Sequence, residues 1–171
     1  MAKKANNVMD RANAPGTITI KDADIFLRNF GGRATKYTPE GTRHFMTRLD
    51  DEQAETLERD GWNIAHFRPR EPGDPETLAL RVWVNYNKWF SPEVYMVIGK
   101  TKTLLTEETI TLLDNAIITR VDMRIRGRRW GDENRGGVKA YLDKMYVTVE
   151  KDELDDLYSF DEEDDGGEIP F

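Results

Sequence analysis

The stretch Val121–Val149 reads VDMRIRGRRWGDENRGGVKAYLDKMYVTV, and it decides the fold. In its first part the apolar residues Val121, Met123 and Ile125 alternate with polar residues. Alternation with a period of two is typical of a strand with one face on a core. Val138–Val149 is a second strand-like segment, and the glycine-rich segment Gly127–Gly137 separates the two. We therefore predict a β-hairpin whose loop is Gly127–Gly137.

Other parts of the chain show the same strand pattern. These segments are Thr17–Phe30, Arg43–Leu49, Leu78–Val84 and Val94–Ile98. Two short helices are expected between strands, Asp51–Arg59 after Asp50 as N-cap and Glu107–Leu113 after Thr106 as N-cap. Strands of unequal length with one or two inserted helices fit a mainly β fold, the partly open Greek-key barrel called the OB-fold. A β-sandwich fits almost as well.

The chain divides into three parts. Residues 1–16 are polar and predict a flexible N-terminal arm, whereas residues 17–149 carry nearly all the apolar periodicity and predict one OB-type domain. The net charge is −7, but residues 150–171 hold eleven acids against one base, which leaves +3 for residues 1–149. The acidic segment has too few apolar residues to offset the entropy of ordering, so we expect a disordered tail.

The composition excludes several classes of protein. With no cysteine and two histidines, the chain lacks the residues for a disulfide framework or an ordinary zinc site. It has no phosphate-binding loop or nucleophile motif, so we predict no catalysis, no cofactor and no metal. Asp22 and Asp24 keep a metal-dependent nuclease as a weaker alternative. No apolar run approaches the ~20 residues of a membrane span, and residues 1–16 lack a secretion signal, so we expect a cytoplasmic protein.

The stretch Arg120–Lys139 is the strongest candidate for a binding surface. It holds seven bases against three acids, with a tryptophan among its glycines. The candidate binding residues in it are Arg124, Arg126, Arg128, Arg129 and Trp130. Guanidinium groups bind phosphates and an aromatic face stacks on any base, so this combination favours single-stranded nucleic acid. The alternative is a solvated edge strand that its charges protect from pairing.

Two further groups combine cations with aromatic rings. Leu80 and Val82 face the core of their strand, which places Arg81 and Trp83 on the opposite face, and Trp89 follows in a loop. A second loop, which corresponds to the first long loop of an OB barrel, adds Arg33, Lys36 and Tyr37. We include all of these residues as candidates for binding single-stranded DNA. For the aromatic residues, the alternative is a second small core under a loop.

The acidic tail ends in Glu168, Ile169, Pro170 and Phe171. This arrangement resembles the C-terminal tip of bacterial single-stranded DNA-binding proteins, where acids precede Ile-Pro-Phe. It departs from the bacterial form by placing Gly166–Gly167 where further acids are usual, and by lacking a long linker. The short linker and the chain length are more similar to the replicative single-stranded DNA-binding proteins of tailed phages.

The resemblance implies a docking peptide for replication or recombination proteins such as a polymerase, a helicase or a recombinase, which acids steer toward a basic partner. It also implies an OB barrel with inserted helices, and the cytoplasm of a bacterial host as the location. We therefore hypothesise a sequence-independent single-stranded DNA-binding protein for replication, recombination or repair, and a homodimer is compatible with the sequence. The alternative is a non-enzymatic phage interaction protein or DNA mimic with no affinity for DNA.

Overall fold

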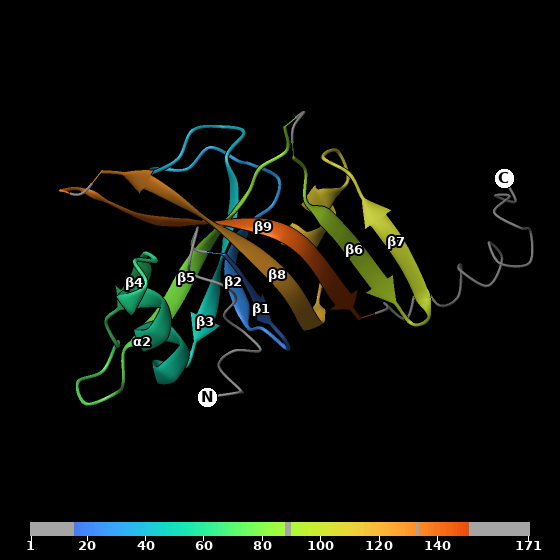
Figure 1. Ribbon diagram of the computed structural model, residues 1–171. Helices are drawn as coiled ribbons and strands as arrows, with labels where there is room; N and C mark the ends of the chain where they lie inside the picture. Colours follow the sequence, from blue (N-terminus) through green and yellow to red (C-terminus); the bar gives the residue numbers. More distant parts are fainter. Residues whose placement is uncertain (1–15, 88–89, 133, 151–171) are drawn as a thin grey trace, which may run out of the picture.

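The computed structural model describes residues 16–87, 90–132 and 134–150. Except for Gly16 and Glu150, the predicted N-terminal arm and acidic tail therefore lie outside the described residues. Nine strands, one α-helix and one 3-10 helix occur in the described ranges (Figure 1). In chain order these elements are β1 (Thr17–Ile20), β2 (Ile25–Asn29), β3 (Arg43–Leu49), α2 (Asp51–Arg59), β4 (Ile64–Phe67), β5 (Thr77–Val84), β6 (Glu93–Ile98), β7 (Thr101–Leu105), η1 (Ile110–Asp114), β8 (Ile118–Gly131) and β9 (Gly136–Val149).

All nine strands belong to one hydrogen-bonded sheet, and within the described residues it does not close, since β1 and β2 at the two ends of its main path do not pair. Its main path runs β1-β8-β9-β5-β3-β2, with β4 beside β5, and with β6 joining β9 to β7. The pairs β5–β9 and β6–β9 are parallel, and the others are antiparallel. The long hairpin β8–β9 crosses the whole molecule in Figure 1 and connects the β3–β5 side to the β6–β7 side.

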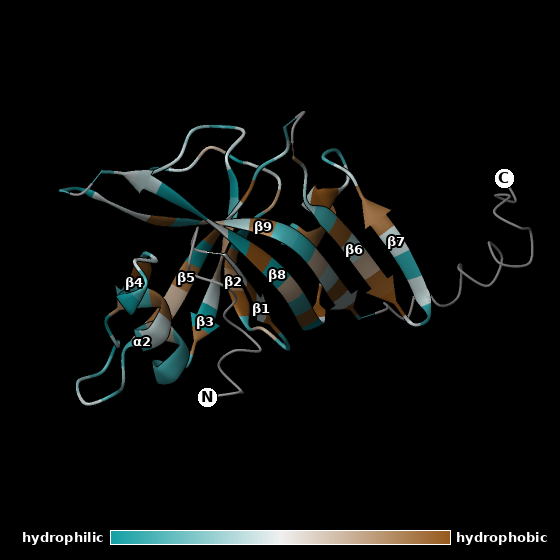
Figure 2. Cartoon of the chain, in the orientation of Figure 1, coloured by the Kyte–Doolittle hydropathy of each residue, from teal (hydrophilic) through white to brown (hydrophobic). Residues whose placement is uncertain are grey.

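The predicted alternation of β8 is confirmed, since Val121, Met123 and Ile125 are buried. The alternating bands of hydrophilic and hydrophobic colour along β8 and β9 in Figure 2 show the same pattern. On β5, Leu80 and Val82 are buried as expected. Each such side chain contributes on the order of 1.5–3 kcal/mol by leaving water, so the core fixes which face of every strand points outward.

One register shift reverses this pattern on β9. Arg124 pairs with Lys144 and Ile125 pairs with Leu142, which leaves Asp143 as an extra residue on β9, a β-bulge. Because of the bulge, the buried positions change from Ala140 and Leu142 to Met145 and Val147. Side chains on both sides of the bulge therefore continue along the same outward face.

The two predicted helices have different outcomes. The helix Asp51–Arg59 is confirmed, and Asp50 caps it by accepting a hydrogen bond of 2.7 Å from the backbone N–H of Gln53. The helix Glu107–Leu113 is wrong, since only the short η1 forms. Thr106 and Thr109 form a turn at the position where the helix was expected to begin. The N–H of Thr106 donates to Oγ1 of Thr109 at 2.7 Å, and the N–H of Thr109 donates to the carbonyl oxygen of Thr106.

The expected single strand Thr17–Phe30 is also wrong, because it is divided into β1 and β2. The break lies at Asp22, whose φ of 52° leaves the extended region and whose N–H donates to Oδ1 of Asp122 at 2.9 Å. As a result β1 pairs with β8, whereas β2 pairs with β3. The strand pattern includes Leu27 among the alternating apolar residues. In the structure Leu27 has a φ of 50° and a largely exposed side chain, so it does not join the core.

Candidate nucleic-acid interface

Two neighbouring strands carry the same three-residue pattern, a cation, a small apolar residue and an aromatic residue. The pattern is Arg81-Val82-Trp83 on β5 and Lys139-Ala140-Tyr141 on β9. The strands are parallel, with Val82 opposite Ala140 and Trp83 opposite Tyr141. Val82 and Ala140 are buried. The cations and rings therefore lie side by side on the outward face of the sheet.

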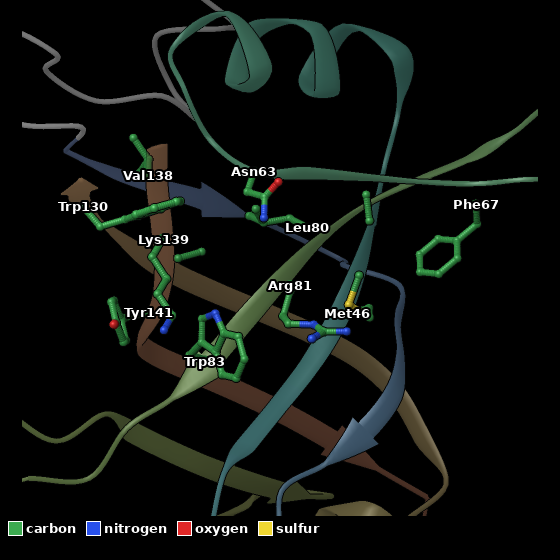
Figure 3. A pocket seen from close by; sticks show the side chains of 12 residues that line it. Met46, Asn63, Phe67, Leu80, Arg81, Trp83, Trp130, Val138, Lys139 and Tyr141 are labelled. Carbon is green, nitrogen blue, oxygen red and sulfur yellow. The ribbon is translucent and has the colours of Figure 1, made fainter. Parts of the chain in front are cut away.

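A groove with a volume of about 710 Å³ lies over this pair of strands. Its lining includes Met46 from β3, Arg81 and Trp83 from β5, Lys139 and Tyr141 from β9, and Trp130 from β8 (Figure 3). Among the described residues, the lining contains two cations and no carboxylate. A surface of this kind attracts an anion and offers flat apolar faces to planar groups.

Trp83 is held from several sides. The Nζ atom of Lys139 lies 4.5 Å from a ring centroid of Trp83, and the guanidinium carbon of Arg81 lies 5.6 Å from it. The imidazole of His44, on the paired strand β3, meets the indole edge to face at 5.4 Å. A cation over an aromatic face contributes about 0.5–1 kcal/mol at an exposed site, so these contacts keep the indole and the two cations together.

His44 supports Trp83 from β3, although it does not itself line the groove. Its side chain is buried, and within the described residues neither ring nitrogen has a hydrogen-bond partner. Burial and, to a smaller extent, the positive charge of Arg81 lower the pKa of His44 below its ordinary value of 6.5. The imidazole is therefore neutral at pH 7, and it supports Trp83 as an apolar contact.

Trp130 lies at the tip of the β8–β9 hairpin, directly opposite Gly137. A Cβ atom added to Gly137 would lie 3.4 Å from Nε1 of Trp130, so the indole occupies the space that the missing side chain leaves. At the turn, Gly131 has a φ of 82°, and a Cβ there would overlap the carbonyl oxygen of Arg135. Glycine at 131 and 137 thus shapes the tip and positions a half-exposed Trp130.

The predicted hairpin loop Gly127–Gly137 is wrong in its extent. The strands continue to Gly131 and resume at Gly136, so Arg128, Arg129 and Trp130 belong to β8. Arg128 is opposite Lys139 on the outward face with Trp130, whereas Arg129 is opposite the buried Val138. Alternation places Arg129 on the opposite face of β8 from Trp130, and neither Arg128 nor Arg129 lines the groove.

Arg124 and Arg126 share one carboxylate. Nε of Arg124 donates to Oδ2 of Asp143, and Nη2 of Arg126 donates to Oδ1 at 3.0 Å. The guanidinium carbon of Arg126 also lies 4.3 Å from the ring centroid of Phe90. We call Arg124, Arg126 and Asp143 the Asp143 cluster. Both arginines lie on the outward face as predicted, but each is already paired with an anion.

The loop candidates do not reach the groove. Arg33, Lys36 and Tyr37 lie between β2 and β3, and none of them lines the groove. Tyr37 is 84% exposed, with Nζ of Lys36 at 5.8 Å from its ring centroid. Trp89 and the tail residues 168–171 lie outside the described residues. The structure thus brings together Arg81, Trp83 and Trp130 and leaves the loop group apart.

Tyr141 and Met46 are groove residues that the sequence analysis missed, and Lys139 was not among its binding candidates. The sequence does hold a signal for Lys139 and Tyr141, because Lys139-Ala140-Tyr141 repeats the pattern of Arg81-Val82-Trp83. Met46 gave no such signal, since an apolar residue in β3 is expected in the core. Only the pairing of β3 with β5 shows that Met46 is opposite Arg81.

The described ranges contain no group of three or more His, Cys, Asp or Glu residues that could hold a metal ion. In the same ranges, the helices are too short or too polar to span a membrane.

Comparison with known proteins identifies the family. Residues 9–166 match the family described as "Putative phage ssDNA-binding domain", and the chain belongs to this family. No curated protein matches. The fold is similar to that of the single-stranded DNA-binding protein from bacteriophage Enc34 in complex with ssDNA, with 11% identity, a TM-score of 0.50, and coverage of 80% of this chain and 88% of that one. Another structure of that phage protein gives 8% identity, a TM-score of 0.48, and coverage of 77% and 80%.

Proposed function

We propose that this protein binds single-stranded DNA without sequence preference, in the groove between Trp83 and Trp130. The observation that carries the proposal is the parallel pairing of β5 with β9, which aligns two cation–aromatic pairs on one outward face. Aromatic faces stack on any base, and cations contact the backbone, so binding needs no base-specific hydrogen bonds. Membership of a phage single-stranded DNA-binding family supports a binding protein and not an enzyme.

The proposed fold is an OB barrel. In this assignment β1 and β2 are two halves of the first strand, and β3, β5, β8 and β9 are the second to fifth strands. The path β1-β8-β9-β5-β3-β2 then has the barrel order, with its parallel contact between the third and fifth strands. OB-folds bind oligonucleotides on the face of the second and third strands, between the first and last hairpin loops. The groove lies on that face beside the last hairpin loop, whereas Arg33, Lys36 and Tyr37 of the first loop do not line it.

In the proposed binding mode, the bases stack on Trp83, Tyr141 and Trp130. Each stacked base contributes roughly 1–3 kcal/mol. Arg81 and Lys139 contact phosphates, and each neutralised phosphate on a single strand releases about 0.7 counterion. The affinity therefore falls as salt concentration rises.

The direct test is fluorescence anisotropy of a labelled oligo-dT titrated with the full chain at two salt concentrations. The proposal expects binding at low salt that weakens at high salt. A protein that mimics DNA or serves only as an interaction partner gives no binding at either concentration. A competing duplex of equal length serves as the control for strand preference.

We also propose that residues 150–171 recruit replication or recombination proteins, on the strength of the acidic run and the Ile-Pro-Phe sequence. This segment carries −10 against +3 for the rest of the chain, so it competes with DNA for the cationic groove. Bound DNA would displace the segment and make it available to a partner.

Removal of residues 152–171 is expected to tighten binding of oligo-dT at low salt, because the competing anion is lost. Pull-down of replication proteins from the host is expected to disappear. The matched control is Phe171→Ala, which keeps every acid and should lose the partner while leaving the DNA affinity unchanged. Weaker or unchanged DNA binding by the shortened chain would contradict competition by the tail.

A further inference from the structure

A second group of rings and cations lies outside the groove, where β6 pairs with β9. Tyr95 and Tyr146 are directly opposite each other, and their rings stack with centroids 5.1 Å apart and planes at 14°. Nζ of Lys102 lies 4.8 Å from the Tyr95 centroid, and Nζ of Lys144 lies 5.5 Å from the Tyr146 centroid. We call these four residues the tyrosine platform. Like the groove, the tyrosine platform combines aromatic rings with nearby cations.

A hollow of about 480 Å³ adjoins the platform and includes Tyr146 and Lys144 in its lining. Four cations line it in all, against one carboxylate from the described residues, Asp122. Asp122 is held by Arg120, whose Nε donates to Oδ2 at 2.9 Å. Arg120 is paired with Asp122 and Arg124 with Asp143, so the attraction of the hollow for an anion depends mainly on Lys21 and Lys144.

The other acid at the platform, Glu93, accepts a hydrogen bond. The hydroxyl of Tyr95 donates to Oε1 of Glu93 at 3.0 Å. This hydrogen bond raises the pKa of Tyr95, so the phenol stays neutral at physiological pH. The two stacked rings thus present uncharged faces between two lysines.

The groove and the platform lie on one continuous face. The bulge at Asp143 keeps Lys144 and Tyr146 on the outward side that Lys139 and Tyr141 occupy before it. From Lys139 to Tyr146 the paired strand β8 advances six residues, from Arg128 to Asp122, because Asp143 is the extra residue of the bulge; this is about 20 Å at roughly 3.3 Å per residue. That length matches about six nucleotides at the ~3.4 Å spacing of a stacked strand. OB-folds occlude about 4–16 nucleotides, so one strand can reach both places.

We propose that the tyrosine platform is a second subsite for the same DNA strand, an inference that rests on the proposed function of the groove. The strand leaves the groove along β9, passes the Asp143 cluster and stacks a base at Tyr95 and Tyr146. Lys102 and Lys144 contact the adjoining phosphates. A strand too short to leave the groove does not meet the platform.

The test compares a short oligo-dT of about 4 nucleotides with a long one of about 16, the limits of OB-fold site sizes. Anisotropy titrations use the full chain and the variants Tyr146→Leu and Tyr146→Phe. Tyr146→Leu removes the aromatic face and is expected to weaken binding of the long oligonucleotide about 5- to 100-fold, with no change for the short one. Tyr146→Phe keeps the ring and is expected to bind both like the parent protein.

Unchanged binding of the long oligonucleotide by Tyr146→Leu would overturn the second subsite, and so would an equal loss for both lengths. The groove variant Lys139→Ala is the positive control, because it should weaken both lengths. Should the parent protein bind neither oligonucleotide, the proposed function of the groove would fail as well. The two failures are therefore distinguishable by the parent titration alone.

Discussion

The groove and the Asp143 cluster each carry two cations on the outward face of the sheet, but they differ in what holds those cations. In the groove, Lys139 and Arg81 lie over the indole of Trp83, and no described carboxylate lines the site. In the cluster, Asp143 accepts hydrogen bonds from both arginines. The difference arises from one inserted residue, because the bulge on β9 turns a carboxylate toward Arg124 and Arg126.

The number of arginines in a sequence therefore does not equal the charge available to DNA. A phosphate that binds Arg126 must compete with Asp143, whereas a phosphate that binds Lys139 displaces only a cation–aromatic contact. Exposed ion pairs contribute about 0.2–1 kcal/mol, and this amount is subtracted from phosphate binding at the cluster. We therefore expect the groove to dominate the affinity.

The largest expected effect is at the groove. Trp83→Leu should weaken binding of oligo-dT by about 1–3 kcal/mol, because the variant removes a stacking face but keeps an apolar side chain. Anisotropy titration measures this loss. Trp83→Phe retains a ring and should recover most of the affinity. An affinity of Trp83→Leu equal to that of the parent protein would place the site elsewhere.

A smaller and opposite effect is expected at the cluster. Asp143→Asn removes the anion from two arginines, so binding at low salt should tighten and the salt dependence should steepen by up to about 1.4 counterions, roughly 0.7 for each arginine. The slope of affinity against salt concentration measures this change. A slope identical to that of the parent protein would show that the arginines never reach a phosphate. Loss of the ion pairs should also lower stability by about 1 kcal/mol.

The smallest effect concerns pH and the histidine that packs against Trp83. The pKa of His44 is lowered by burial, so the unfolded chain binds the proton more readily than the folded one, and stability falls as the pH drops below about 6.5. Hydrogen bonding to Glu58, and to a smaller extent to Glu76, raises the pKa of His66. Protonated His66 therefore stabilises the folded protein below about pH 6.5, and this stabilisation is lost as the pH rises through the pKa of His66 in the folded state.

Thermal unfolding between about pH 5 and pH 7 separates the two histidines, since ordinary carboxyl groups titrate at lower pH. In His66→Gln the opposing effect of His66 is absent, so the stability should fall more clearly as the pH is lowered from about 7 to about 5. In His44→Leu this fall in stability should disappear. An unchanged pH dependence in His44→Leu would mean that the imidazole is not held neutral beside Trp83.

The sequence predicts the local features of this fold. Alternation identifies the core face of β5 and β8, and Asp50 marks the start of α2, because these signals depend on neighbouring residues. The division of Thr17–Phe30 depends on a contact between Asp22 and Asp122, which are far apart in the chain. The bulge at Asp143 likewise depends on how β9 pairs with β8. Such register effects have no local signal.

The candidate site divides in the same way. Arg81, Trp83 and Trp130 follow from strand alternation and composition, and all three line the groove. The role of Tyr141 depends on the parallel contact between β5 and β9, whose paired residues are more than fifty positions apart. The ion pairs of Arg124 and Arg126 depend on the bulge. Sequence therefore predicts the types of residue in the site better than their partners.

Intrinsic tryptophan fluorescence during titration with oligo-dT tests directly whether DNA stacks in the groove. The chain has four tryptophans, of which Trp62 is buried and Trp83 lines the groove. We predict that oligo-dT quenches the fluorescence of the parent protein and of Trp62→Phe, and that Trp83→Phe loses a large part of the quenching. Equal quenching in Trp83→Phe and the parent protein would contradict stacking of DNA in this groove.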